Sequence, residues 1–152
     1  MINYRKATVN DSDILAKIRS IFIVEVVGCS ETERIEVETA NKIYFEKALA
    51  DDSFAAWIAL DDDKIVATSG LSFSVVPPAF KFDGKLAYIM NMFTFPEYRN
   101  QGIGTELLKR VVEEAKNRGY KIIKLNATEM GRPLYEKYEF KDSHGEMIFN
   151  AE

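Results

Sequence analysis

The chain has 152 residues, of which 47% are hydrophobic and 29% are charged, which suits one domain with one core. Its formal net charge of -4 lacks the basic excess of a nucleic-acid-binding surface, and no apolar run approaches the roughly 20 residues of a membrane-spanning helix. The start shows no signal-peptide core, and the single Cys29 excludes an internal disulfide or a Cys/His metal cluster. We therefore expect one domain over residues 1–152, in the cytoplasm, with no metal, nucleic-acid or membrane partner.

The amino-terminal third predicts a short strand over residues 2–8 and then two helices. Residues 10–13 supply an N-cap for the first helix, which Gly28 ends. Ser30 begins a second helix that runs to about Leu49, and its many charges indicate a solvated face. The apolar positions of the first helix are Ile14, Leu15, Ile18, Ile21, Phe22 and Val26; a weaker stripe in the second is Ala40, Ile43, Tyr44 and Leu49.

Residues 54–60 and 64–76 predict an antiparallel hairpin, because both are rich in β-branched and aromatic residues and flank an acidic turn at residues 61–63. Consecutive carboxylates on a tight turn cannot all face one ion, so a metal site there is disfavoured. Residues 77–84 then predict an irregular loop, in which we expect Phe80 and Phe82 to fold over apolar surface, either core or substrate.

Residues 86–119 carry the strongest pattern in the chain. An apolar strand ends at Pro96, two glycines follow, and an amphipathic helix begins at Ile103 and ends near Gly119. Gly102 and Gly104 let backbone N–H groups turn inward and let a bulky anion approach the positive end of the helix. The apolar stripe of this helix is Ile103, Leu107, Leu108, Val111, Val112 and Ala115.

This loop predicts a site for phosphate or pyrophosphate, and its spacing disfavours two other phosphate loops. A Walker A loop would need Gly-Lys-Ser/Thr at the helix start, where Thr105 follows Gly104, and a dinucleotide fingerprint would need a third glycine where Leu107 stands. Residues 96–110 carry nearly balanced charge, so backbone amides must supply most of the binding. The alternative is that the two glycines only make a tight turn.

The loop that holds Gly102 and Gly104, called the glycine loop below, follows the strand that begins at Leu86. After Gly119, residues 121–127 predict a buried strand parallel to that strand, because a strand–helix–strand connection crosses over in that way. Residues 130–138 predict a short helix, and residues 140–149 predict short strands that close the sheet. The fold class is therefore α/β: a single domain with a mixed, twisted sheet of about six or seven strands, antiparallel at its amino end and flanked by four helices.

Two motifs resemble those of the GCN5-related N-acetyltransferase (GNAT) superfamily. Arg99-x-x-Gly102-x-Gly104 is similar to the family's acyl-CoA pyrophosphate loop, and the run from Leu134 to Phe140, Leu-Tyr-Glu-Lys-Tyr-Glu-Phe, is similar to its Leu-Tyr-Glu-Lys-x-Gly-Phe motif. The order of elements suits the family over nearly the whole chain. The resemblance implies acetyl-CoA as cosubstrate and direct transfer of its acetyl group to an amine acceptor in a ternary complex.

The resemblance also implies roles for particular residues. Arg99 opens the pyrophosphate loop. Tyr135 corresponds to the tyrosine that protonates the departing thiolate; the alternative is a core aromatic residue. Glu25 and Glu129 are candidates for the general base, although Glu25 also fits a solvated flank position, and Asn91 either faces the acceptor or ties neighbouring strands together. The remaining cofactor-binding residues would be Met92, Phe93 and Thr94 through the backbone, and Asn100, Gln101, Gly102, Ile103, Gly104 and Thr105 through the loop amides.

The sequence departs from the family pattern at two places. Glu139 replaces the glycine of the second motif, so the turn there must tolerate strain at a non-glycine residue. The segment of residues 125–132 is shorter than usual, and Asn126 is the candidate for the cofactor contact that an asparagine near Thr128 commonly makes.

Three functions are compatible with the sequence: an N-acetyltransferase, a non-catalytic regulatory module that binds CoA or a nucleotide on the same fold, and a partner-binding domain that uses the Glu-rich second helix. No motif in the sequence identifies the acceptor amine. Acidic residues near the expected cleft favour a small cationic amine. The oligomeric state stays open, with a homodimer as one candidate.

Overall fold

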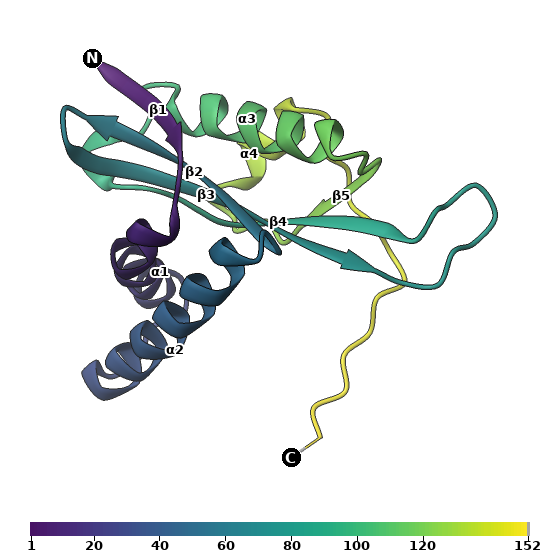
Figure 1. Cartoon of the computed structure of the whole chain (residues 1–152), viewed down its shortest axis with the longest axis horizontal. Coiled ribbons are helices and arrows are strands. Elements are labelled where there is room, and N and C mark those ends of the chain that lie inside the picture. The colour runs from purple at the N-terminus through teal and green to yellow at the C-terminus, as the bar shows by residue number, and fades with distance from the viewer. Residues whose placement is uncertain (152) are drawn as a thin grey trace.

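The computed structural model describes residues 1–151 (Figure 1). Its elements from β1 to α4 occur in the order predicted from the sequence. The strands are β1 (Ile2–Lys6), β2 (Phe54–Asp61), β3 (Lys64–Val75), β4 (Lys85–Thr94) and β5 (Ile122–Leu125); the helices are α1 (Ser12–Val26), α2 (Glu31–Ala50), α3 (Ile103–Asn117) and α4 (Arg132–Lys137), with short 3-10 turns at Val9–Asp11 and Pro96–Tyr98.

The strands form one mixed sheet in the order β1-β2-β3-β4-β5. The first four pair antiparallel, and β5 pairs parallel with β4 after the α3 crossover, as predicted. The fold class and the four helices are confirmed, and among the described residues the sheet has five strands rather than six or seven.

Helices cover both faces of the sheet: α1 and α2 lie on one face and α3 and α4 on the other (Figure 1). All six apolar positions predicted for α3 are buried. On the opposite face, Leu15 of α1 packs with Phe45 of α2 and Phe54 of β2. No α-helix within residues 1–151 is both long and apolar enough to span a bilayer.

The predicted apolar stripe of α2 is confirmed at Leu49, which packs against the core, and is wrong at its other three positions, Ala40, Ile43 and Tyr44, which are exposed. Ile43 and Tyr44 are 65% and 44% exposed, whereas Phe45 and Ala48 are the buried pair. The Phe45 ring is tilted against that of Phe54, with the ring centroids 5.2 Å apart, so this aromatic contact fixes which side of α2 faces the sheet. The capping box at Ser30 and Glu33 marks the helix start.

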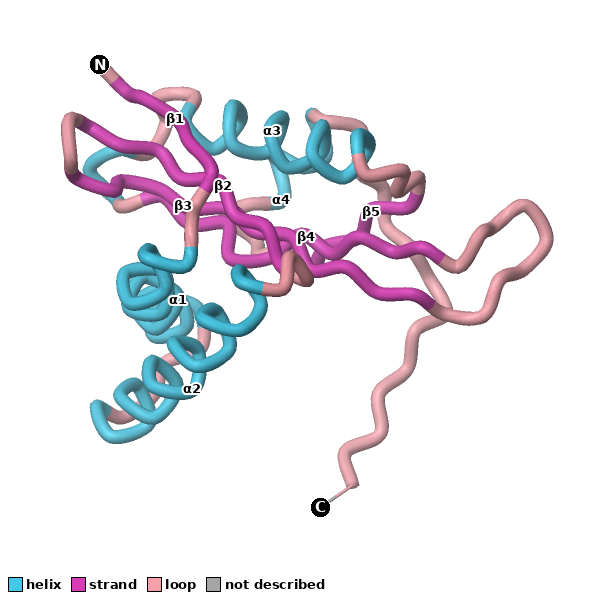
Figure 2. Tube along the Cα trace, in the orientation of Figure 1, coloured by secondary structure: helices cyan, strands magenta, loops and turns pink. Residues whose placement is uncertain are grey.

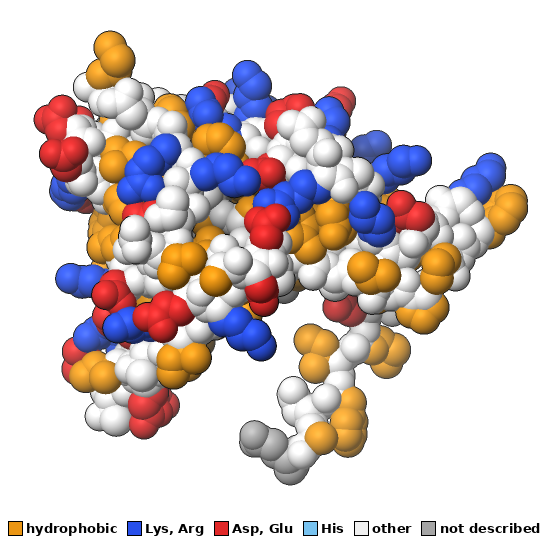
Figure 3. Space-filling view, viewed as in Figure 1, with side chains coloured by type: hydrophobic (Ala, Val, Ile, Leu, Met, Phe, Trp, Pro, Cys, Tyr) orange, Lys and Arg blue, Asp and Glu red, His pale blue; other side chains and the backbone are white. Residues whose placement is uncertain are grey.

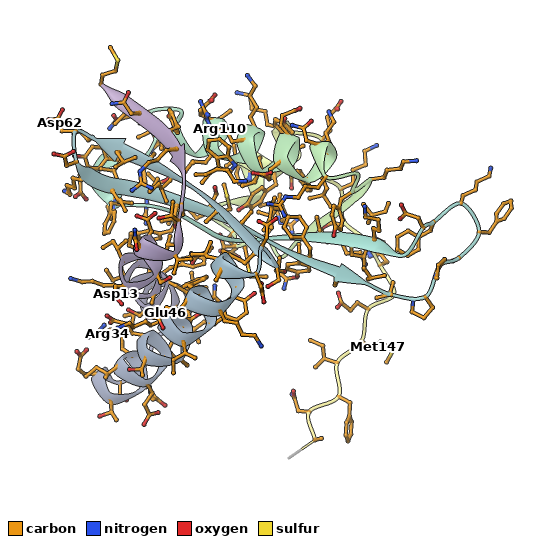
Figure 4. All side chains as sticks on the ribbon, viewed as in Figure 1. Asp13, Arg34, Glu46, Asp62, Arg110 and Met147 are labelled. Atoms are coloured by element: carbon orange, nitrogen blue, oxygen red, sulfur yellow. The ribbon has the colours of Figure 1, made fainter. Side chains whose placement is uncertain are left out.

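The predicted strands over residues 140–149 are absent from the described chain. Phe140 packs against the core beside Tyr135, and residues 141–151 run away from the sheet in an exposed, extended path (Figures 1 and 3). Met147, Ile148 and Phe149 are 93%, 84% and 90% exposed, and Figure 4 shows Met147 on this outlying segment. The neighbouring edge strand β5 has only four residues, none fully buried, so it offers little apolar surface for a further strand.

The loop of residues 77–84 also differs from its prediction. It projects beyond the sheet (Figure 2), and Phe80 is 92% exposed while Phe82 is half-buried. Lys81 stacks over the Phe80 ring at 5.4 Å. Phe80 therefore covers neither core nor cleft.

Candidate active site

One large cleft, of about 1280 Å³, lies where the carboxyl-terminal half of β4, the glycine loop, α1 and the segment after β5 meet. Ten of the predicted cofactor-binding residues line it: Met92, Phe93, Thr94, Arg99, Asn100, Gly102, Ile103, Gly104, Thr105 and Asn126. Gln101 does not. Its side-chain nitrogen donates instead to the Glu97 carbonyl at 3.1 Å.

The cleft exists because β4 and β5 separate. Their pairing covers only Leu86 to Ile89 of β4, so the following residues have no β5 neighbour. At that point β4 also bulges: Thr68 pairs with Phe93 but Gly70 pairs with Met90, so two β4 residues oppose one on β3. Beyond the bulge, one edge of β4 faces the cleft.

Asn91 forms this bulge. Its φ of 60° is the left-handed conformation, which asparagine tolerates better than most residues. Its carbonyl accepts a hydrogen bond from Thr68 Oγ1 at 2.9 Å. The side chain is 2% exposed, and neither its nitrogen nor its oxygen has a hydrogen-bond partner within residues 1–151. Because buried polar groups are nearly always paired, this amide marks a place for a ligand or water.

The glycine loop presents unpaired amides to the cleft. Gly102 has φ 81° and caps α3, and the first helical hydrogen bond runs from the Glu106 N–H to the Gly102 carbonyl. The amides of residues 103–105 therefore have no acceptor within the helix. A Cβ on Gly102 would meet no atom within 4 Å, so the space above the loop is open. This geometry suits a phosphate group.

Arg99 stands beside the loop, held by two contacts. Its Nε donates to the Thr94 carbonyl at 2.8 Å, and one terminal nitrogen lies 2.8 Å from the carboxylate of Glu25 on α1. The guanidinium also lies 5.5 Å from the centre of the Phe93 ring. Glu25 therefore reaches the cleft, but as the ion-pair partner of Arg99.

Tyr135 lines the cleft from α4. It is 8% exposed, and burial raises the pKa of its phenol above the ordinary value of about 10. No hydrogen bond from its hydroxyl is formed within the described chain. Gly131 makes room for the ring, since a Cβ there would lie 2.9 Å from Tyr135 Cε2. A protonated phenol thus borders the same cleft as the loop amides.

The segment between β5 and α4 brings Asn126 and Glu129 to the rim of the cleft. Both side chains are exposed. The Thr128 hydroxyl accepts a hydrogen bond from the Gly131 N–H at 3.0 Å and so fixes the turn into α4. Within the described chain Glu129 has no ion-pair partner. No group of three or more metal-ligating side chains occurs among residues 1–151.

Sequence reasoning missed Arg19, which lines the cleft from α1. A signal was present: Arg19 lies directly after the buried Ile18 and three residues before the cleft-lining Phe22, so a cation stands at the border of an apolar stripe.

Unpaired amides at a helix terminus and a buried phenol lie in one cleft beside a split pair of parallel strands, an arrangement that fits the acyltransferase resemblance of the two motifs. Residues 19–140 match the model of the Acetyltransferase (GNAT) family. The chain belongs to this family, as its two motifs predicted.

Solved structures with the same fold cover the whole chain. A predicted acetyltransferase of Clostridium acetobutylicum, crystallised with acetyl-CoA, is 36% identical with a TM-score of 0.91, over 99% of this chain and 96% of the other. A GCN5-related N-acetyltransferase of Ralstonia eutropha JMP134 is 25% identical with a TM-score of 0.89 over the full length of both.

Curated relatives match over shorter stretches. The mouse (Mus musculus) thialysine N-epsilon-acetyltransferase is 33% identical over 57 residues, which are 38% of this chain and 34% of that protein. A probable N-acetyltransferase, camello, of Xenopus tropicalis is 30% identical over 95 residues, 60% of this chain and 41% of its own. The matches thus span less than half the length of these two relatives.

Proposed function

We propose that the protein is an acetyl-CoA-dependent N-acetyltransferase that transfers the acetyl group directly to a primary amine. The observation that carries this proposal is the convergence, in one cleft, of the free edge of β4, the unpaired amides before α3 and the buried Tyr135 phenol. The acetyl-CoA of the Clostridium acetobutylicum relative supports the choice of cosubstrate.

The fit to acetyl-CoA rests on two parts of the cleft. The amides of residues 103–105, with Arg99 beside them, suit a pyrophosphate, and the backbone of Met92, Phe93 and Thr94 suits the amide groups of a pantetheine arm. Acetyl-CoA would supply the acetyl group as a thioester. Asn126 at the rim is a further polar contact for the cofactor.

The side chains of the protein would supply and accept the protons that the transfer requires. As the amine nitrogen forms its bond to the carbonyl carbon, the carbon–sulfur bond breaks and a thiolate leaves. Tyr135 donates its proton to that thiolate, because a phenol with a raised pKa stays protonated at neutral pH. The amine loses a proton to a general base, for which Glu129 and Glu25 are the carboxylates at the cleft.

The alternative is a non-catalytic module that binds CoA or a nucleotide in the same cleft. The unpaired amide of Asn91 and the phenol of Tyr135 both lie outside the phosphate loop. They favour an enzyme, since a module that held only the phosphate groups would need neither.

The cytoplasmic location and a homodimer remain predictions. The exposed Met147, Ile148 and Phe149 favour association, which light scattering with and without residues 141–152 would test.

Two measurements test the proposal. Acetyl-CoA should raise the melting temperature by binding the folded state, and free thiol should then appear when an amine panel is added. Stabilisation without thiol release from any amine would favour the regulatory module. No stabilisation by millimolar acetyl-CoA or CoA would refute both.

A further inference from the structure

A second, smaller cavity of about 200 Å³ adjoins the cleft on its α1–α2 side. The two cavities share Arg19, Met90 and Asn91 in their walls, and α2 adds Asn41, Tyr44 and Phe45 to the smaller one. At about 30 Å³ per water molecule, the side cavity has room for six or seven heavy atoms. It leads away from the glycine loop's end of the cleft and lies beside the bulge in β4.

Arg19 is the charged side chain in the described wall of this cavity, and no counterion for it occurs among residues 1–151. Within residues 1–151 its guanidinium forms no hydrogen bond and no ion pair, although it is half-buried. Burial lowers the pKa of Arg19 from its ordinary value, as expected for a cation held partly away from water without a carboxylate. Every other arginine pairs with a carboxylate: Arg5, Arg34, Arg99, Arg110, Arg118 and Arg132.

Asn91 adds an unsatisfied donor and an unsatisfied acceptor to the same place. Both side-chain atoms are buried without a partner, whereas the Asn41 nitrogen already donates to the Val37 carbonyl at 2.8 Å. Tyr44 is the one other titratable side chain described in the wall of the side cavity. Among the described residues, the wall of the cavity therefore offers one free cation, the unpaired amide of Asn91 and no carboxylate.

We propose that the acceptor is an amine that also carries a carboxylate, an amino acid or a small derivative of one, whose carboxylate binds Arg19 in the side cavity. Asn91 then hydrogen-bonds the acceptor between Arg19 and the cleft, where the amine meets the thioester. A doubly charged phosphate would call for more than one cation, and a purely cationic amine would meet Arg19 as a like charge. This inference rests on the proposed function and narrows its acceptor class.

The first test compares matched acceptors. Each of the 20 amino acids is assayed for thiol release beside its carboxamide, with diaminopentane and phosphoethanolamine as amines that lack a carboxylate. Wild type should use at least one amino acid with kcat/KM about 10- to 100-fold above its amide, as expected for the loss of one charged hydrogen-bonded contact. Equal use of acid and amide, or a preference for the diamine or the phosphate, would overturn the proposal.

The second test assigns the preference to Arg19. In Arg19→Gln, kcat/KM for the amino acid should fall about 10- to 100-fold while that for the amide changes less than threefold. Arg34→Gln is the matched control, because Arg34 lies on the part of α2 that extends away from the sheet (Figure 4) and lines neither cavity. An unchanged acid-to-amide ratio in Arg19→Gln, with the acetyl-CoA-induced rise in melting temperature intact, would refute the role of Arg19.

Binding separates this inference from the proposed function. In the presence of CoA, the preferred amino acid should raise the melting temperature of wild type and of Arg34→Gln but not of Arg19→Gln. If no amine releases thiol and this pattern still appears, the transfer reaction is wrong and the carboxylate site stands. If thiol is released with amines regardless of their carboxylate, the enzyme stands and the carboxylate site is wrong.

Discussion

Replacing Tyr135 by Phe removes one proton from the cleft and little else. Tyr135 is 8% exposed and its ring lies 6.1 Å from that of Phe140, and a phenylalanine ring can keep this burial and this contact. The hydroxyl has no hydrogen-bond partner in the described chain, so its loss leaves no buried donor or acceptor unpaired. We therefore expect the free energy of unfolding to change by less than about 1 kcal/mol and the affinity for acetyl-CoA to persist.

Turnover should respond differently. Loss of a general acid typically lowers kcat by about 10²- to 10⁴-fold, and we expect the lower end, because an open cleft admits water as a substitute donor. Because the proton is delivered only in the transition state, kcat and kcat/KM should fall together. The raised pKa of Tyr135 also predicts that wild-type kcat will not decline between pH 7 and about 9, since the phenol stays protonated there.

The assay is thiol release under conditions where chemistry limits the rate. Tyr138→Phe is the matched control: Tyr138 packs on the same core one turn further on and does not line the cleft. Turnover of Tyr135→Phe within twofold of wild type would refute the acid role, and equal losses in both variants would indicate a packing effect.

Three further changes test the loop and the frame around it. Gly102→Asp should abolish stabilisation by acetyl-CoA, because it places a carboxylate in the open space above the loop amides; Gly145→Asp, also at positive φ with nothing within 4 Å, should not. Glu139→Gly should raise the free energy of unfolding by about 0.5–1 kcal/mol and the melting temperature by about 2–3 °C, since Glu139 has φ 71°; a lower melting temperature would contradict the strain argument. Asp11→Asn should cost about 1.5–3 kcal/mol at pH 7, measured by urea unfolding, because Asp11 binds Arg5 through two contacts of 2.9 Å. The pKa of Asp11 is lowered in the fold, chiefly by its hydrogen bonds with Arg5, so this stabilisation is present above the unfolded value near 3.9 and is lost as the pH falls through the folded value; a difference from wild type that does not shrink as the pH falls below the unfolded value would refute it.

The part of the fold that the sequence predicted well is the part where local signals agree. In α3 the apolar spacing, the glycine cap and the preceding Pro96 all indicate one helix start, and the six predicted core positions are buried. The parallel pairing of β4 and β5 follows from the connection alone. These features depend on interactions between residues close together in the chain and on the handedness of the crossover connection, and both can be predicted from the sequence.

The features that escaped prediction depend on packing between different elements of the fold. The buried side of α2 is set by the contact of Phe45 with Phe54, nine residues later in another element, and α2 alone has too weak a pattern to show it. The exposed path of residues 141–151 depends on how much apolar surface the edge strand β5 offers for a further strand to pack on. Arg19 was missed because an arginine within a helix normally finds a carboxylate, and only the folded chain shows that this one does not.

The geometry also separates the two candidates for the general base. The Glu25 carboxylate lies 2.8 Å from Arg99, whose Nε is in turn bonded to the Thr94 carbonyl. If Glu25 accepted a proton from the amine, this ion pair would weaken at the moment when Arg99 faces the pyrophosphate, so the acid–base step would work against cofactor binding. Glu129 has no ion-pair partner among the described residues. It lies on the segment that leads into α4, the helix that holds Tyr135. We therefore favour Glu129 as the base, with acid and base supplied by one short segment and Glu25 left to position Arg99.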